Sequence, residues 1–501
     1  MQRNLTKSIF KISLLSAALA LAACSSDDDD DGDGIIDEVT DPGDPDADGD
    51  ADGDGDADGD ADGDGDGDAD GDGDADAPVS AAAGVIYALT NGHNLATQIA
   101  AAEDAVDEEF VNQIVAYARS AEGVLTQIDV YDTGGLGENI RNSGANPLAS
   151  QDPLIVSKDN RFVFAVNAGS ESISSFVIND DFSLTPASLN MSTTGNSNAQ
   201  NPVTLTIFED TLYVANSGAF FDAEGNPATT LPDPRFRSAS SIIGFTVNDD
   251  GTLTELAGSE IPNIGANAGS IEFSSDGGFL YITERRTNDI VTVEMDENQL
   301  PVGVSSRITS ITEQPFGTDL YPTENGDILL ISEGNNGAPG LSALSSYLIE
   351  DSGDLTGISV SSGVAGDPLL TGFTFGCWVE FVETPTGDFA YVSNTPDGVI
   401  SSFAVGDEGG LTILEQTAGV TGIEGDDTQN GAGVLDAEIV FPFLYQVVNN
   451  DSRIAQFVIN EDGTLTRQEA VEVVDTELLR CLLYTSPSPR DQRGSRMPSS
   501  A

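Results

Sequence analysis

One pattern recurs seven times between residues 84 and 476, and it limits the fold more than any other feature. Each copy holds a short run of mostly alternating apolar residues that ends in Asn or an acid, as in FVFAVN at 162–167 and FLYITE at 279–284. A second such run follows, for example SSFVIN at 174–179. An acidic glycine turn then leads into a third run, as in EDGTLTRQEA at 461–470. Runs of this composition with period two predict β-strands, and the turns predict antiparallel hairpins.

A further apolar stretch precedes each copy after the first, such as PVTLTIF at 202–208 and CWVEFV at 377–382. Each repeat of roughly 45–60 residues therefore holds four short strands. Seven such units predict an all-β fold, a seven-bladed β-propeller of four-stranded antiparallel blades, because radial repetition leaves only short sheet edges. We expect the propeller to span 80–480. Its Ala-rich stretch 95–110 is expected to form a short helix or ordered loop over the pore mouth.

The repeated FLY-V-N and DGTLT elements resemble the lactonase-type seven-bladed propellers, a family that includes a 6-phosphogluconolactonase and a carboxymuconate cyclase. The resemblance covers about 80–476. It implies a lactone-opening activity, with histidine and arginine near the starts of the innermost strands, where this chain reads SQDPLIVS, AQNPVTLT and ANAGSIEF. It also implies that a C-terminal strand closes the ring as the innermost strand of blade 1.

Residues 1–23 have the pattern of a lipoprotein signal peptide. Three basic residues precede the apolar run 12–21, and the segment LAAC that ends at Cys24 resembles the lipobox of bacterial lipoproteins. This resemblance implies that Cys24 becomes the lipid-modified first residue and holds the protein to a membrane. We expect an outer-membrane lipoprotein that faces the periplasm or the cell surface. The alternative is an ordinary signal peptide with an incidental cysteine.

Residues 24–79 form an Asp/Gly-rich segment with almost no apolar side chains. Such a segment cannot bury enough surface to offset its chain entropy, so we expect an extended, unfolded tether. Four of its aspartates follow the D-x-D-x-D-G spacing of calcium loops: Asp29, Asp31, Asp33 and Asp37. The twelfth position of that loop holds Thr40 instead of a bidentate acid. Loose Ca²⁺ binding and an inert charged spacer both remain open, and no cofactor is required.

The excess of acidic residues limits which partners the protein can bind. Residues 77–480 hold 58 Asp and Glu against 12 Lys and Arg, so the domain repels nucleic acid. We expect a monomer whose partners are the membrane, through the lipid, and an unknown small-molecule or protein ligand.

Residues 481–501 differ from the rest of the chain, because they hold three arginines and a single acid. The string CLLYTSPSPRD resembles translated sequencing adapter, and the alternative is a native basic tail. In the first case the native chain is truncated near residue 480, and blade 1 keeps three native strands. The tail is then expected to be disordered, or to occupy the empty position because CLLYT is apolar.

The candidate site is expected on the face that collects the loops leading into the first strands and leaving the second strands, since loops on rigid scaffolds usually carry sites. From the former come Gln151, Asn201, Asn267, Gln314 and Cys377. From the latter come His93, Asn167, Asn216, Glu284, Arg285, Glu333, Asn394 and Asn449. The asparagines also fit a structural role, because Asn readily closes turns. Cys377 is most simply a small buried hydrophobe, with a nucleophile as the alternative.

Two functions remain open at this point. One is a ligand- or protein-binding module displayed at the cell envelope. The other is a hydrolase that opens a lactone ring, which needs a base and a group that stabilises the oxyanion. Its candidate residues are Glu284 or Glu333 as base, Arg285 as oxyanion partner, and His93, the only histidine. An acid–arginine pair in a central funnel would favour the hydrolase, and a flat acidic mouth lined by Asn and Gly would favour the binding module.

Overall fold

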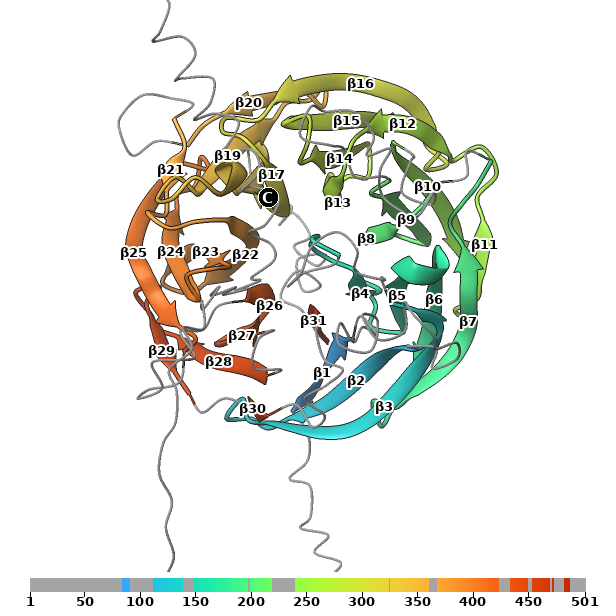
Figure 1. The fold of residues 1–501 in the computed structure, drawn as a ribbon, viewed down its shortest axis with the longest axis horizontal. Helices are drawn as coiled ribbons and strands as arrows, with labels where there is room; N and C mark the ends of the chain where they lie inside the picture. Colours follow the sequence, from blue (N-terminus) through green and yellow to red (C-terminus); the bar gives the residue numbers. More distant parts are fainter. Residues whose placement is uncertain are drawn as a thin grey trace, which may run out of the picture. The chain divides into compact units, whose positions relative to one another are not determined.

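The computed structural model is a ring of seven antiparallel sheets around a central axis (Figure 1). The predicted seven-bladed propeller of four-stranded blades is therefore confirmed. The structure describes residues 83–90, 111–137, 148–196, 199–218, 239–323, 325–359, 367–422, 433–448, 453–468, 471–472 and 482–486. The signal segment, the Asp/Gly-rich tether and the predicted helix at 95–110 lie outside these ranges. Within them, no helix is long and apolar enough to cross a bilayer.

Each blade is a meander in which consecutive strands pair from the channel outward. Blade 1 contains β1 (Gly84–Leu89), β2 (Val111–Arg119) and β3 (Leu125–Leu136). Blade 2 contains β4 (Leu154–Val156), β5 (Phe162–Asn167), β6 (Ser172–Ile178) and β7 (Leu184–Ser192). Blade 3 contains β8 (Pro202–Phe208), β9 (Thr211–Asn216), β10 (Ser240–Val247), β11 (Leu253–Glu255) and β12 (Ile261–Gly265). Blade 4 contains β13 (Ala268–Phe273), β14 (Phe279–Glu284), β15 (Asp289–Met295) and β16 (Pro301–Thr309). Blade 5 contains β17 (Pro315–Thr323), β18 (Gly326–Glu333), β19 (Ala343–Ile349), β20 (Leu355–Gly357) and β21 (Leu369–Leu370).

Blade 6 contains β22 (Gly376–Thr384), β23 (Gly387–Asn394), β24 (Val399–Val405) and β25 (Leu411–Val420). Blade 7 contains β26 (Val434–Val440), β27 (Phe443–Val448), β28 (Arg453–Ile459), β29 (Leu465–Arg467) and β30 (Val471–Glu472). In blades 3, 5 and 7 the outer position is shared by two short strands that both pair with the third strand. Two short 3₁₀ turns, η1 (Ala168–Ser170) and η2 (Asn335–Gly337), follow second strands.

The innermost strand of blade 1 is β31 (Leu482–Ser486), which comes from the tail segment CLLYTS. It pairs antiparallel with β1, from Val85 opposite Ser486 to Leu89 opposite Leu482. Blade 1 therefore has three strands from the first part of the chain, and the apolar tail segment occupies the fourth position. This is one of the two outcomes expected for the tail from its sequence.

The DGTLT element forms the turn between the third and fourth strands of a blade. In blade 3, Gly251 has a φ of +79°, and the carboxylate of Asp250 accepts hydrogen bonds from the backbone N–H (3.1 Å) and the hydroxyl (2.6 Å) of Thr252. These bonds hold the pKa of Asp250 below its usual value. The sequence pattern thus has a local cause: glycine adopts the left-handed conformation and aspartate closes the turn.

The tyrosine of the FLY element joins neighbouring blades. Its hydroxyl, on a second strand, donates to a carbonyl in the turn before the outer strand of the next blade: Tyr87 to Phe182 (2.8 Å), Tyr213 to Gln299 (2.7 Å), Tyr281 to Gly353 (3.2 Å) and Tyr391 to Gly463 (3.1 Å). The bond from Tyr445 to Gly123 (2.8 Å) joins blade 7 to blade 1. The ring is therefore closed by this tie as well as by β31.

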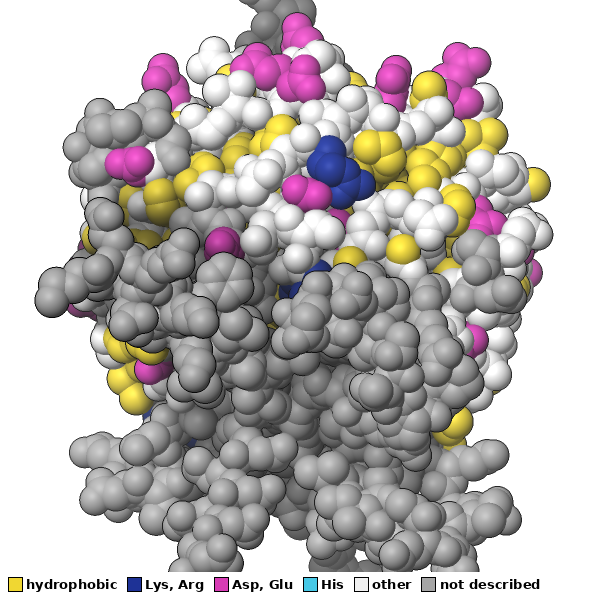
Figure 2. All heavy atoms as spheres, turned by 45° about the horizontal axis from the view of Figure 1, so that its top comes forward, with side chains coloured by type: hydrophobic (Ala, Val, Ile, Leu, Met, Phe, Trp, Pro, Cys, Tyr) yellow, Lys and Arg dark blue, Asp and Glu magenta, His cyan; other side chains and the backbone are white. Residues whose placement is uncertain are grey.

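The outer strands carry a mixed surface. Acidic side chains stand among apolar ones on the face shown in Figure 2. On β16, for example, Val302 and Val304 are 64% and 45% exposed. The apolar residues of the inner three strands, in contrast, form the packed layers between blades.

Candidate functional site

The segment that leads into β4 reaches the middle of the ring (Figure 1). Within it, the fully buried Gln151 donates through Nε2 to the carbonyls of Thr318 (2.9 Å) and Val379 (3.0 Å). Its Oε1 accepts the backbone N–H of Val379 (3.2 Å). A side chain from the start of blade 2 is thus bonded to the innermost strands of blades 5 and 6, across the channel.

Two hydrogen bonds of the adjacent Ser150 also connect this segment to other innermost strands. Trp378 donates its indole N–H to the carbonyl of Ser150 (2.8 Å), and the Ser150 hydroxyl donates to the carbonyl of Val203 (2.7 Å). A Cβ on Gly317 would lie 2.0 Å from Oε1 of Gln151, so the tie requires glycine there. The centre of the ring is filled at this level, on the face where the sequence analysis expected the site.

Glu284, one of the two predicted bases, is the last residue of β14 and is fully buried. Its Oε2 accepts the hydroxyl of Ser240 (3.1 Å), and its Oε1 has no hydrogen-bond partner among the described residues. Burial raises the pKa of Glu284 to about 8, against the opposing effects of the Ser240 bond and the charge of Arg307. A Cβ on Gly265 would lie 2.3 Å from Cδ of Glu284, so only glycine leaves room for the carboxyl group.

Glu333, the other predicted base, holds the equivalent position at the end of β18 and is also fully buried. Its carboxyl group accepts hydrogen bonds from the hydroxyls of Ser310 and Ser345 and from the backbone N–H of Thr312 (3.0 Å). Burial raises the pKa of Glu333, and these bonds oppose the rise. Both predicted bases therefore lie inside the packed blades.

The predicted asparagines at the ends of second strands share this environment. The three that the structure describes are fully buried, and each accepts a threonine hydroxyl from the blade before it: Asn167 from Thr133 (2.6 Å), Asn216 from Thr193 (3.0 Å) and Asn394 from Thr371 (2.8 Å). Ser310 makes the corresponding bond to Glu333. This repeated polar position therefore ties each of blades 2 to 6 to its predecessor.

Arg285, the predicted oxyanion partner, is only 5% exposed. Its guanidinium group donates to the side chain and the carbonyl of Asn267, and it lies 5.1 Å from the centre of the Phe316 ring. Asn267, another predicted site residue, leads into β13 with a φ of +67°. The structure thus brings Arg285 and Asn267 together within blades 4 and 5.

Cys377 is fully buried on β22, which fits the small-hydrophobe interpretation. His93, Asn449, Cys24 and the four aspartates of the calcium-like loop lie outside the described residues. Within the described ranges, no group of three or more His, Cys, Asp or Glu side chains could hold a metal ion.

The channel contains a cavity of about 200 Å³ between the innermost strands of blades 2 to 5. The walls from blades 2 and 3 are mostly apolar, and include Ile155, Val156, Leu205, Ile207 and Phe208. The opposite wall carries Glu272 on β13 and Asp319 on β17, while Asp152 lies at the start of β4 and Lys158 at the rim. Lys158 and Ser275 belong to turns that join first to second strands, so the cavity lies toward the face opposite the predicted one.

Sequence reasoning missed this cavity, although a signal for it was present. Glu272 and Asp319 lie at the same register position, opposite Tyr281 of β14 and Leu330 of β18. The same position holds Glu380 opposite Tyr391 in blade 6 and Glu438 opposite Tyr445 in blade 7. An acid in the middle of an apolar innermost strand, repeated in four consecutive blades, indicates a polar channel.

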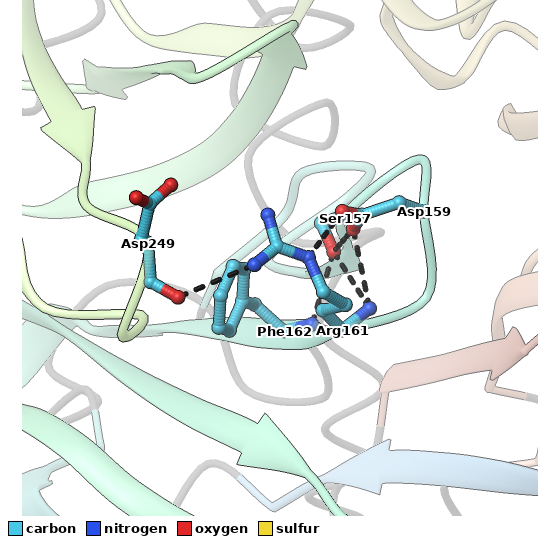
Figure 3. Close-up of polar contacts among 5 residues, drawn as sticks. All are labelled: Ser157, Asp159, Arg161, Phe162 and Asp249. Atoms are coloured by element: carbon cyan, nitrogen blue, oxygen red, sulfur yellow. Dashed lines mark hydrogen bonds and ion pairs between the residues drawn. The ribbon is translucent and has the colours of Figure 1, made fainter.

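The turn at the cavity rim is fixed by its own contacts (Figure 3). Arg161 pairs with Asp159, donates to the carbonyl of Asp249 (3.2 Å) and lies 4.6 Å from the centre of the Phe162 ring. Ser157 also donates to Asp159 (2.7 Å). Burial opposes ionisation of Asp159, yet the bonds from Arg161 and Ser157 outweigh it and hold its pKa below the usual value. Lys158 therefore projects from an ordered turn.

Comparison with known proteins identifies the fold. No family model and no curated protein matches the sequence. Among solved structures, similar chains include candidate 6-phosphogluconolactonases from Bacteroides uniformis (TM-score 0.52, 16% identity, 80% of this chain and 99% of that one) and Bacteroides fragilis (0.52, 15%, 80% and 98%). A functionally unknown protein from Desulfotomaculum acetoxidans matches equally well in TM-score (0.52, 10%, 80% and 98%). The chain therefore has a lactonase-like seven-bladed propeller fold, and its activity must be argued from its site.

Proposed function

We propose that the protein is a ligand-binding propeller of the cell envelope, which holds a small molecule in the cavity of its central channel. The observation that carries this proposal is the cavity itself, about 200 Å³ with an apolar wall and a few converging charged groups. Position at the envelope rests on the Cys24 pattern.

Two features of the site favour binding over hydrolysis of a phosphorylated lactone. The predicted bases Glu284 and Glu333 are both fully buried, and their hydrogen bonds tie blades together. The cavity is lined by three carboxylates and one lysine, and a net negative cavity repels a phosphate group.

The test is a ligand-observed NMR screen of a fragment library against the full chain and two variants. Thr206, which lines the cavity, is replaced by tryptophan to fill it. Thr412, exposed on β25, receives the same substitution as the control. We expect fragments that bind the wild-type chain and the Thr412→Trp variant but not the Thr206→Trp variant. Fragments that bind all three chains equally, or none at all, would contradict the proposal.

The alternative function, a hydrolase that opens a lactone ring, has one specific observation in its favour. Burial brings the pKa of Glu284 to about 8, near the range that suits a general base at neutral pH, and Arg285 follows it in the chain. Under this alternative, Glu284→Gln abolishes lactone turnover and Arg285→Ala lowers it at least about tenfold. Turnover that is present but unchanged in both variants would remove these residues from the site; His93 would then be the next to replace.

The envelope anchor and the tether have separate tests. If Cys24 carries lipid, Cys24→Ser should move the protein from the membrane fraction to the soluble fraction, and it should abolish incorporation of labelled palmitate. If Asp29, Asp31, Asp33 and Asp37 bind Ca²⁺, calorimetry on the full chain should give a heat of binding that the fourfold Asp→Asn variant lacks. No difference in either comparison would contradict the respective assignment.

A further inference from the structure

We infer that the channel cavity selects a small organic cation with an apolar body, an inference that rests on the proposed binding function. The cavity is asymmetric in a way that fits such a ligand. The lining from β4 and β8 is mostly apolar, with Asp152 and Lys158 at the two ends of β4, whereas Glu272 of β13 and Asp319 of β17 place two carboxylates opposite it. An ammonium group and a hydrocarbon body therefore have separate places to lie.

The charged wall has a fixed geometry. Asp319 is 2% exposed, and its two oxygens accept the backbone N–H groups of Leu320 (2.7 Å) and Phe381 (2.7 Å). These bonds orient the carboxylate on β17. Glu272 on β13 occupies the same register position in the neighbouring blade, and Asp152 adds a third carboxylate to the lining. Among the described residues of the lining, Lys158 is the only basic one, so the cavity attracts cations.

Aromatic side chains from β8 and β13 lie beside these carboxylates. Phe208 and Phe273 both line the cavity, with ring centres 5.6 Å apart at an interplanar angle of 46°. Aromatic faces attract ammonium groups as well as apolar bodies. A neutral ligand would gain only the apolar part of the lining.

A buried hydroxyl on the same strand is a second, independent observation. Thr204 of β8 is fully buried, and its Oγ1 has no hydrogen-bond partner among the described residues. Thr204 does not itself line the cavity, but it is adjacent to Leu205 and two residues from Thr206, which do, and it projects to the same side of the strand as Thr206. A buried hydroxyl without a partner is costly, and an ammonium donor would satisfy it.

The test uses three probes with the same phenyl body: 2-phenylethylammonium, 2-phenylethanol and 3-phenylpropanoate. Their affinities for the full chain are measured by calorimetry at low and at high sodium chloride. We expect the ammonium to bind at least about tenfold more tightly than the alcohol, and the carboxylate to bind weakest, because one charge-assisted contact is worth that much. A loose attraction to the acidic surface would disappear at high salt, whereas binding inside the cavity is screened less and persists.

Matched variants locate the binding. Glu272→Gln removes one carboxylate from the cavity, and we expect it to reduce ammonium affinity about tenfold without changing alcohol affinity. Glu294→Gln removes the same charge from an exposed position of β15 in the same blade and is expected to change neither. Equal affinities for ammonium and alcohol would overturn the cation inference and leave the binding function standing. No binding of any of the three probes would overturn the inference, and the fragment screen would then decide the proposed function separately.

Discussion

Replacing Glu284 by glutamine should change how the stability of the propeller depends on pH. The carboxyl group is fully buried, with one oxygen bonded to Ser240 and the other without a partner among the described residues. Glutamine has nearly the same size and stays neutral, so it imitates the protonated acid. The Ser240 bond and the space left by Gly265 remain available to it.

The size of the effect follows from the pKa, which burial raises from 4.5 to about 8. Each pKa unit between the folded and unfolded chains is worth about 1.4 kcal/mol, so ionising Glu284 in the folded chain costs about 5 kcal/mol. The folded chain keeps this proton up to about pH 8, whereas the unfolded chain releases it near its ordinary pKa of 4.5. Between these two values the folded chain binds more protons, so its free energy of unfolding falls as the pH rises. Below 4.5 the contribution is complete, and above about 8 it has been lost.

The measurement is urea-induced unfolding of the wild-type chain and the Glu284→Gln variant across this range of pH. The difference between the two free energies of unfolding removes the contribution of other groups, including Glu333, whose pKa is raised in the same direction. We expect the two free energies of unfolding to agree within about 1 kcal/mol below pH 4.5, and the value for the variant to exceed that of the wild type by about 1.4 kcal/mol more for each pH unit from 4.5 toward 8. Parallel curves would show that Glu284 ionises normally and that the buried geometry does not shift its pKa.

Two further substitutions test the ring. Gln151→Ala should lower the free energy of unfolding by about 2–4 kcal/mol, because it leaves two buried carbonyls across the channel without their donor. Gln113→Ala, at a half-buried position of β2 whose side chain bonds only at the surface to Asp132, should cost less than about 0.5 kcal/mol in the same denaturation assay. Gly123→Ala should cost about 2–4 kcal/mol, since its φ is +88° and the new Cβ would lie 2.5 Å from the Phe443 ring. Gly410→Ala, where nothing lies within 4 Å, is its control. Equal losses in either pair would contradict the blade contacts described above.

The fold could be predicted from the sequence because its signals are local and repeated. Alternation within FLYITE and the Asp-Gly turn of DGTLT each depend on a few neighbouring residues, and seven copies set the number of blades. The role of Glu284 could not be predicted in the same way. A polar residue at the end of a strand faces the pore mouth or the neighbouring blade according to how blades pack, and that packing joins residues distant in the sequence. Gln151 is a stronger case, because its partner Val379 is 228 positions away.

The repeat itself indicates where function should be sought. The position at the end of the second strand is polar and buried in blades 2 to 6, and it bonds to its neighbours whether it is Asn167 or Glu333. The role of this position is the same in each blade, so the role belongs to the ring and not to a ligand. The register position in the middle of the innermost strand behaves differently, since it holds Ile155 in blade 2, Thr206 in blade 3 and carboxylates from blade 4 onward. A position that varies around a ring of otherwise similar units breaks its symmetry, and a small asymmetric ligand in the channel can be recognised only by such positions. If the protein binds a ligand in its channel, its specificity therefore lies on the innermost strands, whereas the end-of-strand position holds the blades together.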